Sequence, residues 1–175
     1  MKYIKYGLLA LSVVLTGCAF GPPIDSIEQA TAWSSQVKVT KDPYKNETNY
    51  EGPRLVLAPK GGLVTMFFRM TKASDGTGSP QLYVISDYYS GHWRFYREAN
   101  TSDGKSHPLV AIAQNVSSCR SECSYREDVG ITFTRAELND YTVKGMSLKI
   151  SGRGGEQVVE IPWTFILSFV LRVPS

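Results

Sequence analysis

The chain has 175 residues, of which 42% are hydrophobic and 20% are charged, and its formal net charge is +3. This composition excludes a collagenous, low-complexity or disordered protein, and the length favours one domain over two. Without Lys2 and Lys5, the basic and acidic residues nearly balance, which argues against a nucleic-acid-binding protein.

Residues 1–17 have the pattern of a signal peptide. Lys2 and Lys5 precede an apolar run from Gly7 to Leu15, which is shorter than the roughly 20 residues of a membrane-spanning helix. A positively charged start followed by a short apolar run is typical of export signals. We therefore expect an exported protein.

The signal ends in Leu15-Thr16-Gly17-Cys18, which resembles the lipobox of bacterial lipoproteins. The resemblance implies cleavage before Cys18, acylation of Cys18 and a lasting membrane anchor through the lipid. An ordinary secretory signal in which a cysteine happens to follow Gly17 is the alternative. Ala19 stands where such lipoproteins carry Asp when they stay at the inner membrane, so the resemblance implies the outer membrane. We expect a lipidated tether over 18–32 and a β-rich, periplasm-facing domain over 33–175.

Beyond the tether, hydrophobic and polar residues alternate as in β-strands. Capping-box spacing at 25–28 predicts a short helix over 26–32, and Ala136 to Leu138 favour a helical turn over 135–140. Pro162 before the apolar run 163–173 predicts a C-terminal helix. Strands are expected at 37–39, 55–57, 63–70, 82–89, 92–99, 109–116, 129–133, 146–150 and 158–161. The fold class is therefore mainly β: an antiparallel β-sandwich or open barrel with short helical caps and a C-terminal helix.

The segments 82–89 and 92–99 flank Ser90-Gly91, which is the spacing of a two-residue hairpin turn. In that register, Asp87 pairs with Arg94, and the core face carries Tyr88, Trp93 and Phe95. The opposite face carries Tyr83, Ile85, Tyr89, His92 and Tyr96. Aromatic rings bordered by charges can stack on sugars or anchor a protein partner, so this face is the candidate binding site. The alternative is that another segment covers it.

Cys119 and Cys123 are left as a pair in an oxidising compartment once Cys18 is acylated. A structural disulfide that locks a tight turn between two strands is the main interpretation. A thiol redox site is the second, but the spacing is not that of thioredoxin-like motifs. A metal site is the third, and it would need more ligands than His92 and His107 supply.

Motifs that carry catalysis are missing from the sequence: it has no phosphate-binding glycine loop, no Gly-x-Ser-x-Gly and no His-Glu-x-x-His. His107 precedes Pro108 and is interpreted as a solvated turn residue. Glu122, Glu127 and Asp128 are interpreted as a solvated, ion-paired rim. We expect no catalytic residue, no cofactor and no bound metal, and therefore not an enzyme.

Two further resemblances concern the domain itself. The segment 96–170 resembles a loosely defined group of uncharacterised Gram-negative outer-membrane lipoproteins, which implies a β-rich domain without an assigned activity. The residues that carry this resemblance are Tyr96 to Ala99, Asp103 to Lys105, Cys119, Cys123, Tyr125, Glu127, Ser151 to Arg153 and Pro162. Ser90-Gly91 and Tyr141 to Gly145 are similar to two short elements of envelope lysozyme-inhibitor lipoproteins.

These observations predict an outer-membrane-anchored lipoprotein with a non-catalytic structural or binding role. Its partners would be the membrane, through the lipid, and an envelope protein or glycan. The alternatives are a hydrolase acting on envelope glycans and a lysozyme-inhibitor-like lipoprotein.

Overall fold

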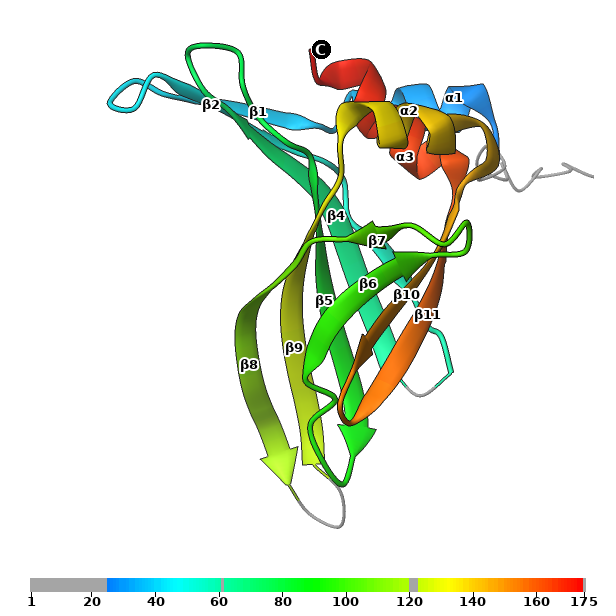
Figure 1. The fold of residues 1–175 in the computed structure, drawn as a ribbon. Helices are drawn as coiled ribbons and strands as arrows, with labels where there is room; N and C mark the ends of the chain where they lie inside the picture. Colours follow the sequence, from blue (N-terminus) through cyan, green and yellow to red (C-terminus); the bar gives the residue numbers. More distant parts are fainter. Residues whose placement is uncertain (1–24, 61, 120–122, 175) are drawn as a thin grey trace, which may run out of the picture.

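The computed structural model of the chain describes residues 25–60, 62–119 and 123–174. This part consists of two antiparallel sheets, which do not close into a barrel, and three helices (Figure 1). The predicted fold class, mainly β with a C-terminal helix, is confirmed. The signal peptide, Cys18 and the start of the tether lie outside the described residues and stay predictions.

The larger sheet has seven strands, and β5 lies near its centre with β4 on one side and β9 on the other. Its strands are, in spatial order, β1 (Lys38–Asp42), β2 (Glu47–Glu51), β4 (Gly62–Lys72), β5 (Gln81–Ser90), β9 (Cys123–Thr132) and β8 (Leu109–Cys119), with β3 (Leu55–Leu57) paired to β4. The edge strand β8 carries two irregularities in its pairing with β9, at Ala111/Ala113 and at Val116/Ser118. The alternation predicted for β5 is confirmed, because Leu82 and Tyr88 are buried while Tyr83 is half-buried on the other face.

The smaller sheet has four strands. Its order is β11 (Gly155–Ile161), β10 (Met146–Gly152), β6 (Tyr96–Thr101) and β7 (Ser106–His107). The predicted hairpin between 82–89 and 92–99 is therefore wrong, since β6 pairs with β10 and β7. Both edges of β5 are already paired, so residues 91–95 instead carry the chain from the large sheet to the small one. We call these five residues the crossing segment.

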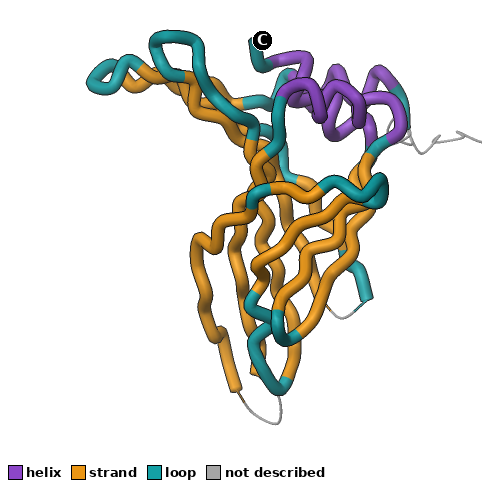
Figure 2. Tube along the Cα trace, in the orientation of Figure 1, coloured by secondary structure: helices purple, strands orange, loops and turns teal. Residues whose placement is uncertain are grey.

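Three helices lie together at one end of the molecule, as the purple tubes of Figure 2 show. They are α1 (Ile27–Ser34), α2 (Arg135–Lys144) and α3 (Trp163–Arg172). Ser26 caps α1, and Thr134 caps α2 through a capping box with Glu137. None of the helices in the described ranges has the length and hydropathy to cross a bilayer.

The core lies between the two sheets and beneath the helices. Phe68 of β4 is 1% exposed, and its ring centroid lies 5.5 Å from that of Phe165 and 5.4 Å from that of Phe169, both on α3. Burying such rings supplies most of the favourable free energy of folding. Phe68 therefore fixes the C-terminal helix to the large sheet.

Candidate functional site

The candidate binding face predicted from the sequence is only partly present. Tyr83 and Ile85 lie half-buried on the outer face of the large sheet, and Tyr89 is 71% exposed near the end of β5. His92 is exposed in the crossing segment, with Nε2 3.2 Å from the carbonyl oxygen of Gly154. Tyr96 was placed wrongly: it is 2% exposed in the core, because β6 belongs to the other sheet.

The structure also revises three other interpretations of the sequence. Trp93 and Phe95 are half-buried in the crossing segment instead of filling the core. Asp87 pairs with Arg126, not with Arg94. The two elements that resemble lysozyme inhibitors lie at opposite ends of the molecule, one at the end of β5 and the other at the end of α2 (Figure 1). They therefore do not form one site.

A stack of two aromatic rings and two guanidinium groups occupies the outer face of the large sheet. The rings of Phe67 and Tyr83 have centroids 5.0 Å apart and are inclined by 16°. The guanidinium carbon of Arg69 lies 4.6 Å from the Tyr83 centroid, and that of Arg54 lies 5.0 Å from the Phe67 centroid. Each ring thus already has an aromatic and a cationic partner, which leaves less ring surface for a ligand than the sequence suggested.

A row of polar contacts continues this face across β5 and β9. The Tyr83 hydroxyl donates to Asp128 Oδ2 at 2.8 Å. Burial of the hydroxyl is the larger cause, and this hydrogen bond the smaller one, of a raised pKa of Tyr83. The other carboxylate oxygen, Asp128 Oδ1, is buried and has no hydrogen-bond partner among the described residues. Arg126 donates to both oxygens of Asp87, at 2.8 and 3.0 Å, and these hydrogen bonds raise the pKa of Arg126. The outer face is therefore polar and well ordered around Tyr83.

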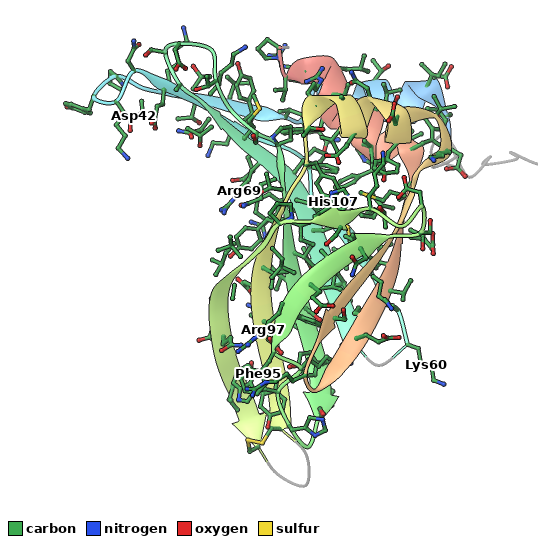
Figure 3. All side chains as sticks on the ribbon, viewed as in Figure 1. Asp42, Lys60, Arg69, Phe95, Arg97 and His107 are labelled. Carbon is green, nitrogen blue, oxygen red and sulfur yellow. A yellow bond between two sulfur atoms is a disulfide. The ribbon has the colours of Figure 1, made fainter. Side chains whose placement is uncertain are left out.

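A cleft of about 500 Å³ adjoins the stack. It is lined by Asn49, Tyr50, Glu51, Arg69, Met70, Thr71, Ser79, Gln81 and Thr132, and we call it the Arg69 cleft. Arg69 donates through Nε and Nη2 to Gln81 Oε1, at 2.9 and 2.6 Å, and the Thr71 hydroxyl donates to Asn49 Oδ1 at 2.7 Å. Figure 3 shows Arg69 projecting outward below the β1–β2 hairpin. The cleft thus offers amides, hydroxyls, a carboxylate and a guanidinium on fixed strands.

Glu127 is the buried group that the sequence interpretation missed. It is 2% exposed, and it accepts a hydrogen bond from the Tyr88 hydroxyl. Its carboxylate also accepts from the backbone N–H groups of Arg94, Phe95 and Tyr96 and from Gln114 Nε2, at 3.0, 3.0, 3.2 and 3.2 Å. Five donors satisfy a carboxylate that would otherwise be costly to bury. Instead of a solvated rim, Glu127 is the anchor of the crossing segment.

Glu127 also explains two neighbouring features. Phe95 has a φ of +53°, which bulky residues rarely adopt, and the hydrogen bonds from residues 94–96 to Glu127 hold it there. Burial and the contact with Glu127 raise the pKa of Tyr88. The signal in the sequence was the alternation of β9, which places Glu127 on the same face as the buried residues Tyr125 and Val129.

His107 is buried, contrary to the sequence interpretation. Its side chain is 1% exposed, and its ring lies 4.4 Å from that of Phe133. Its Nε2 is 3.2 Å from Thr101 Oγ1, and its Nδ1 is 4.0 Å from Glu137 Oε1. Thr101 is 5% exposed and donates its single hydroxyl proton to Asp103 at 2.5 Å. His107 must therefore donate to Thr101 and does not act as a base toward it, so this group is structural.

His107 should make the fold sensitive to mild acid. Burial lowers the pKa of His107, against the opposing effects of Glu137 and Asp103. The unfolded chain, whose histidines have a pKa of about 6.5, then binds the proton first as the pH falls. We expect the free energy of unfolding, measured by urea titration, to fall between about pH 7.5 and 5.5, and His107→Gln to flatten that dependence.

The other histidine supplies the control for this prediction. The chain has 2 histidines, and His92 is exposed. His92→Gln should keep the wild-type slope of stability against pH. Equal slopes in wild type and His107→Gln would contradict the prediction.

The disulfide between Cys119 and Cys123 is confirmed. The two Cα atoms are 4.1 Å apart and form the last pair of the β8–β9 ladder. Glu122, together with the rest of 120–122, lies outside the described residues. Within the described ranges, no three His, Cys, Asp or Glu side chains gather in a way that could hold a metal ion.

The Arg69 cleft is the candidate functional site because Arg69, which lines it, also stacks on Tyr83 of the predicted face. Sequence reasoning missed the cleft because its walls come from β2, β4, β5 and β9, which only the fold brings together. Comparison of the chain with protein-family models, with curated proteins and with solved structures finds no match.

Proposed function

We propose that the protein is a lipid-anchored envelope protein with a non-catalytic binding role, and that the Arg69 cleft takes a saccharide. The observation that carries this proposal is the lining of the cleft: two amides, three hydroxyls, one carboxylate and one guanidinium beside Tyr50. Sugars present many hydroxyl groups, each of which both donates and accepts hydrogen bonds. Amides and hydroxyls, which also do both, match them.

The size and rigidity of the cleft support the same proposal. Its volume of about 500 Å³ lies within the range of small-molecule sites. Arg69 and Gln81 hold each other through two hydrogen bonds, and Arg69 also stacks on Tyr83. Side chains that are fixed before binding lose little conformational entropy when a ligand arrives. A polar ligand therefore meets an ordered site.

Arg69→Ala should weaken saccharide binding about tenfold or more, because it removes a charged donor and frees Gln81. The measurement is calorimetric titration of the full chain with soluble peptidoglycan fragments and with lipopolysaccharide core oligosaccharides. Arg54→Ala is the matched control, since Arg54 stacks on Phe67 but does not line the cleft. Equal affinity in the two variants, or no binding of either glycan by the wild type, would refute the proposal.

Cys18 should carry the lipid, as the motif Leu15-Thr16-Gly17-Cys18 indicates. Mass spectrometry of the mature protein should find an acylated N-terminal cysteine. Cys18→Ser should abolish membrane fractionation, because the acyl chains supply the anchoring free energy. A Cys18→Ser protein that still sediments with outer membranes would argue against the anchor.

A further inference from the structure

The end of the molecule opposite the helices is built by close packing of the crossing segment on the β10–β11 turn (Figure 1). A Cβ atom on Gly152 would lie 2.1 Å from the carbonyl oxygen of Phe95, and one on Gly154 would lie 2.0 Å from that of Trp93. The Gly154 N–H donates to the carbonyl oxygen of Arg94 at 2.9 Å. Only glycine allows the two segments to approach this closely.

Two arginines flank a hollow at this junction. The hollow has a volume of about 230 Å³ and is lined by Arg97, Glu98, Ser151, Gly152 and Arg153. Arg97 and Arg153 are exposed, and neither forms an ion pair with a carboxylate among the described residues. Arg97 lies opposite the irregularity in β10 between Ser151 and Gly152. Two guanidinium groups are therefore available on one small surface.

Arg153 is held in place by an aromatic ring. Its guanidinium carbon lies 5.1 Å from the centroid of Phe95, and the Phe95 ring lies 6.2 Å from that of Trp93. Figure 3 shows the labelled residues Phe95 and Arg97 close together at this end of the molecule. Because Glu127 fixes the backbone of Phe95, the ring under Arg153 has a defined position.

We propose that this hollow, which we call the Arg97/Arg153 site, binds the oxyanion of an acidic saccharide, either a carboxylate or a phosphate ester. Guanidinium groups bind both anions through paired, charge-assisted hydrogen bonds. The hollow is smaller than the roughly 300 Å³ at which small-molecule sites begin, so it takes one group of a larger ligand.

Glu98 favours a saccharide over an acidic peptide. Its carboxylate stands in the wall of the hollow, 3.5 Å from the Ser151 hydroxyl that donates to it. There it can accept hydrogen bonds from sugar hydroxyls, while it repels a second negative charge. The site thus suits one anion flanked by hydroxyl groups. It is separate from the Arg69 cleft and does not depend on the function proposed for that cleft.

The test is calorimetric titration of the full chain with trigalacturonate and with its methyl ester, which lacks the charges. Glucose-6-phosphate against glucose forms the second pair, and a triglutamate peptide is the competing class of ligand. We expect binding of at least one charged sugar, weakened by salt and about tenfold or more by Arg97→Gln or by Arg153→Gln. The pair with the larger difference in affinity between its charged and its neutral sugar shows whether the site prefers a carboxylate or a phosphate. Arg153→Lys, which keeps the charge, should retain part of the affinity.

Arg172→Gln is the control, since Arg172 is an exposed arginine at the helical end. It should leave binding unchanged. Binding that Arg69→Ala removes belongs to the Arg69 cleft and is not counted for the Arg97/Arg153 site. Three outcomes would overturn the proposal: equal binding of charged and neutral sugars, tighter binding of triglutamate, or unchanged affinity in both Gln variants. A negative result in these titrations does not contradict the function proposed for the Arg69 cleft, because Arg69→Ala and Arg54→Ala test that function separately.

Discussion

Glu127→Ala is expected to lower the free energy of unfolding by about 3 to 5 kcal/mol. The substitution removes the common acceptor of the Tyr88 hydroxyl, Gln114 and the backbone N–H groups of residues 94–96. Tyr88 is 1% exposed and Tyr96 is 2% exposed, so their donors would stay buried without an acceptor. Urea unfolding gives the loss, and hydrogen exchange should show faster exchange of the amide protons at 94–96.

Glu156→Ala is the matched control for Glu127. Glu156 is also a strand glutamate, but its side chain is 61% exposed and pairs with Lys149 at 3.7 Å. Its removal should cost less than about 1 kcal/mol. Glu127→Gln, which keeps the shape and one oxygen, should give an intermediate loss. Similar losses for the two alanine variants would show that the carboxylate does not hold the crossing segment.

Phe68→Ala is expected to cost about 3 to 5 kcal/mol, because it opens a cavity between β4 and α3. Phe68 contacts both Phe165 and Phe169, so the helix loses two ring contacts at once. Thermal or urea unfolding measures the loss. Leu63→Ala is the control: Leu63 lies on the same strand but is 43% exposed on the outer face of the sheet, where solvent can fill the space. Equal losses at the two positions would contradict the assignment of the core to the Phe68 side.

The strand pattern was predictable where it depends on alternation within one strand. The alternation of β5 separates Tyr83 from Tyr88, and the structure has the two residues on opposite faces. The pairing of β5 was not predictable, because its neighbour after Ser90 is decided by residues far along the chain. A Ser-Gly pair favours a tight turn locally, but Glu127 offers the backbone N–H groups of residues 94–96 a buried acceptor. These tertiary hydrogen bonds outweigh the local preference for a turn, and the chain enters the smaller sheet.

The surroundings of the polar residues were not predictable for the same reason, since residues far along the chain provide them. His107 precedes Pro108, which is typical of a loop, but the pairing of β7 with β6 turns the ring onto Phe133. Arg69 and Gln81 belong to strands of alternating pattern, and nothing local indicates that Asn49 and Thr132 lie beside them. The disulfide was predictable because the two cysteines are close in sequence, and the predicted export signal would place them in an oxidising compartment.

The edge strand β8 bears on whether copies of this protein associate with one another. A long strand with one free side is a template on which another molecule can add its own strand and begin an aggregate. The eleven residues of β8 include no lysine, glutamate or proline to discourage that addition. Its two irregularities break the even spacing of backbone groups that an incoming strand needs, and the disulfide ties its end to β9. The two irregularities and the disulfide, instead of charged side chains, thus oppose the addition of a strand from a second molecule to β8.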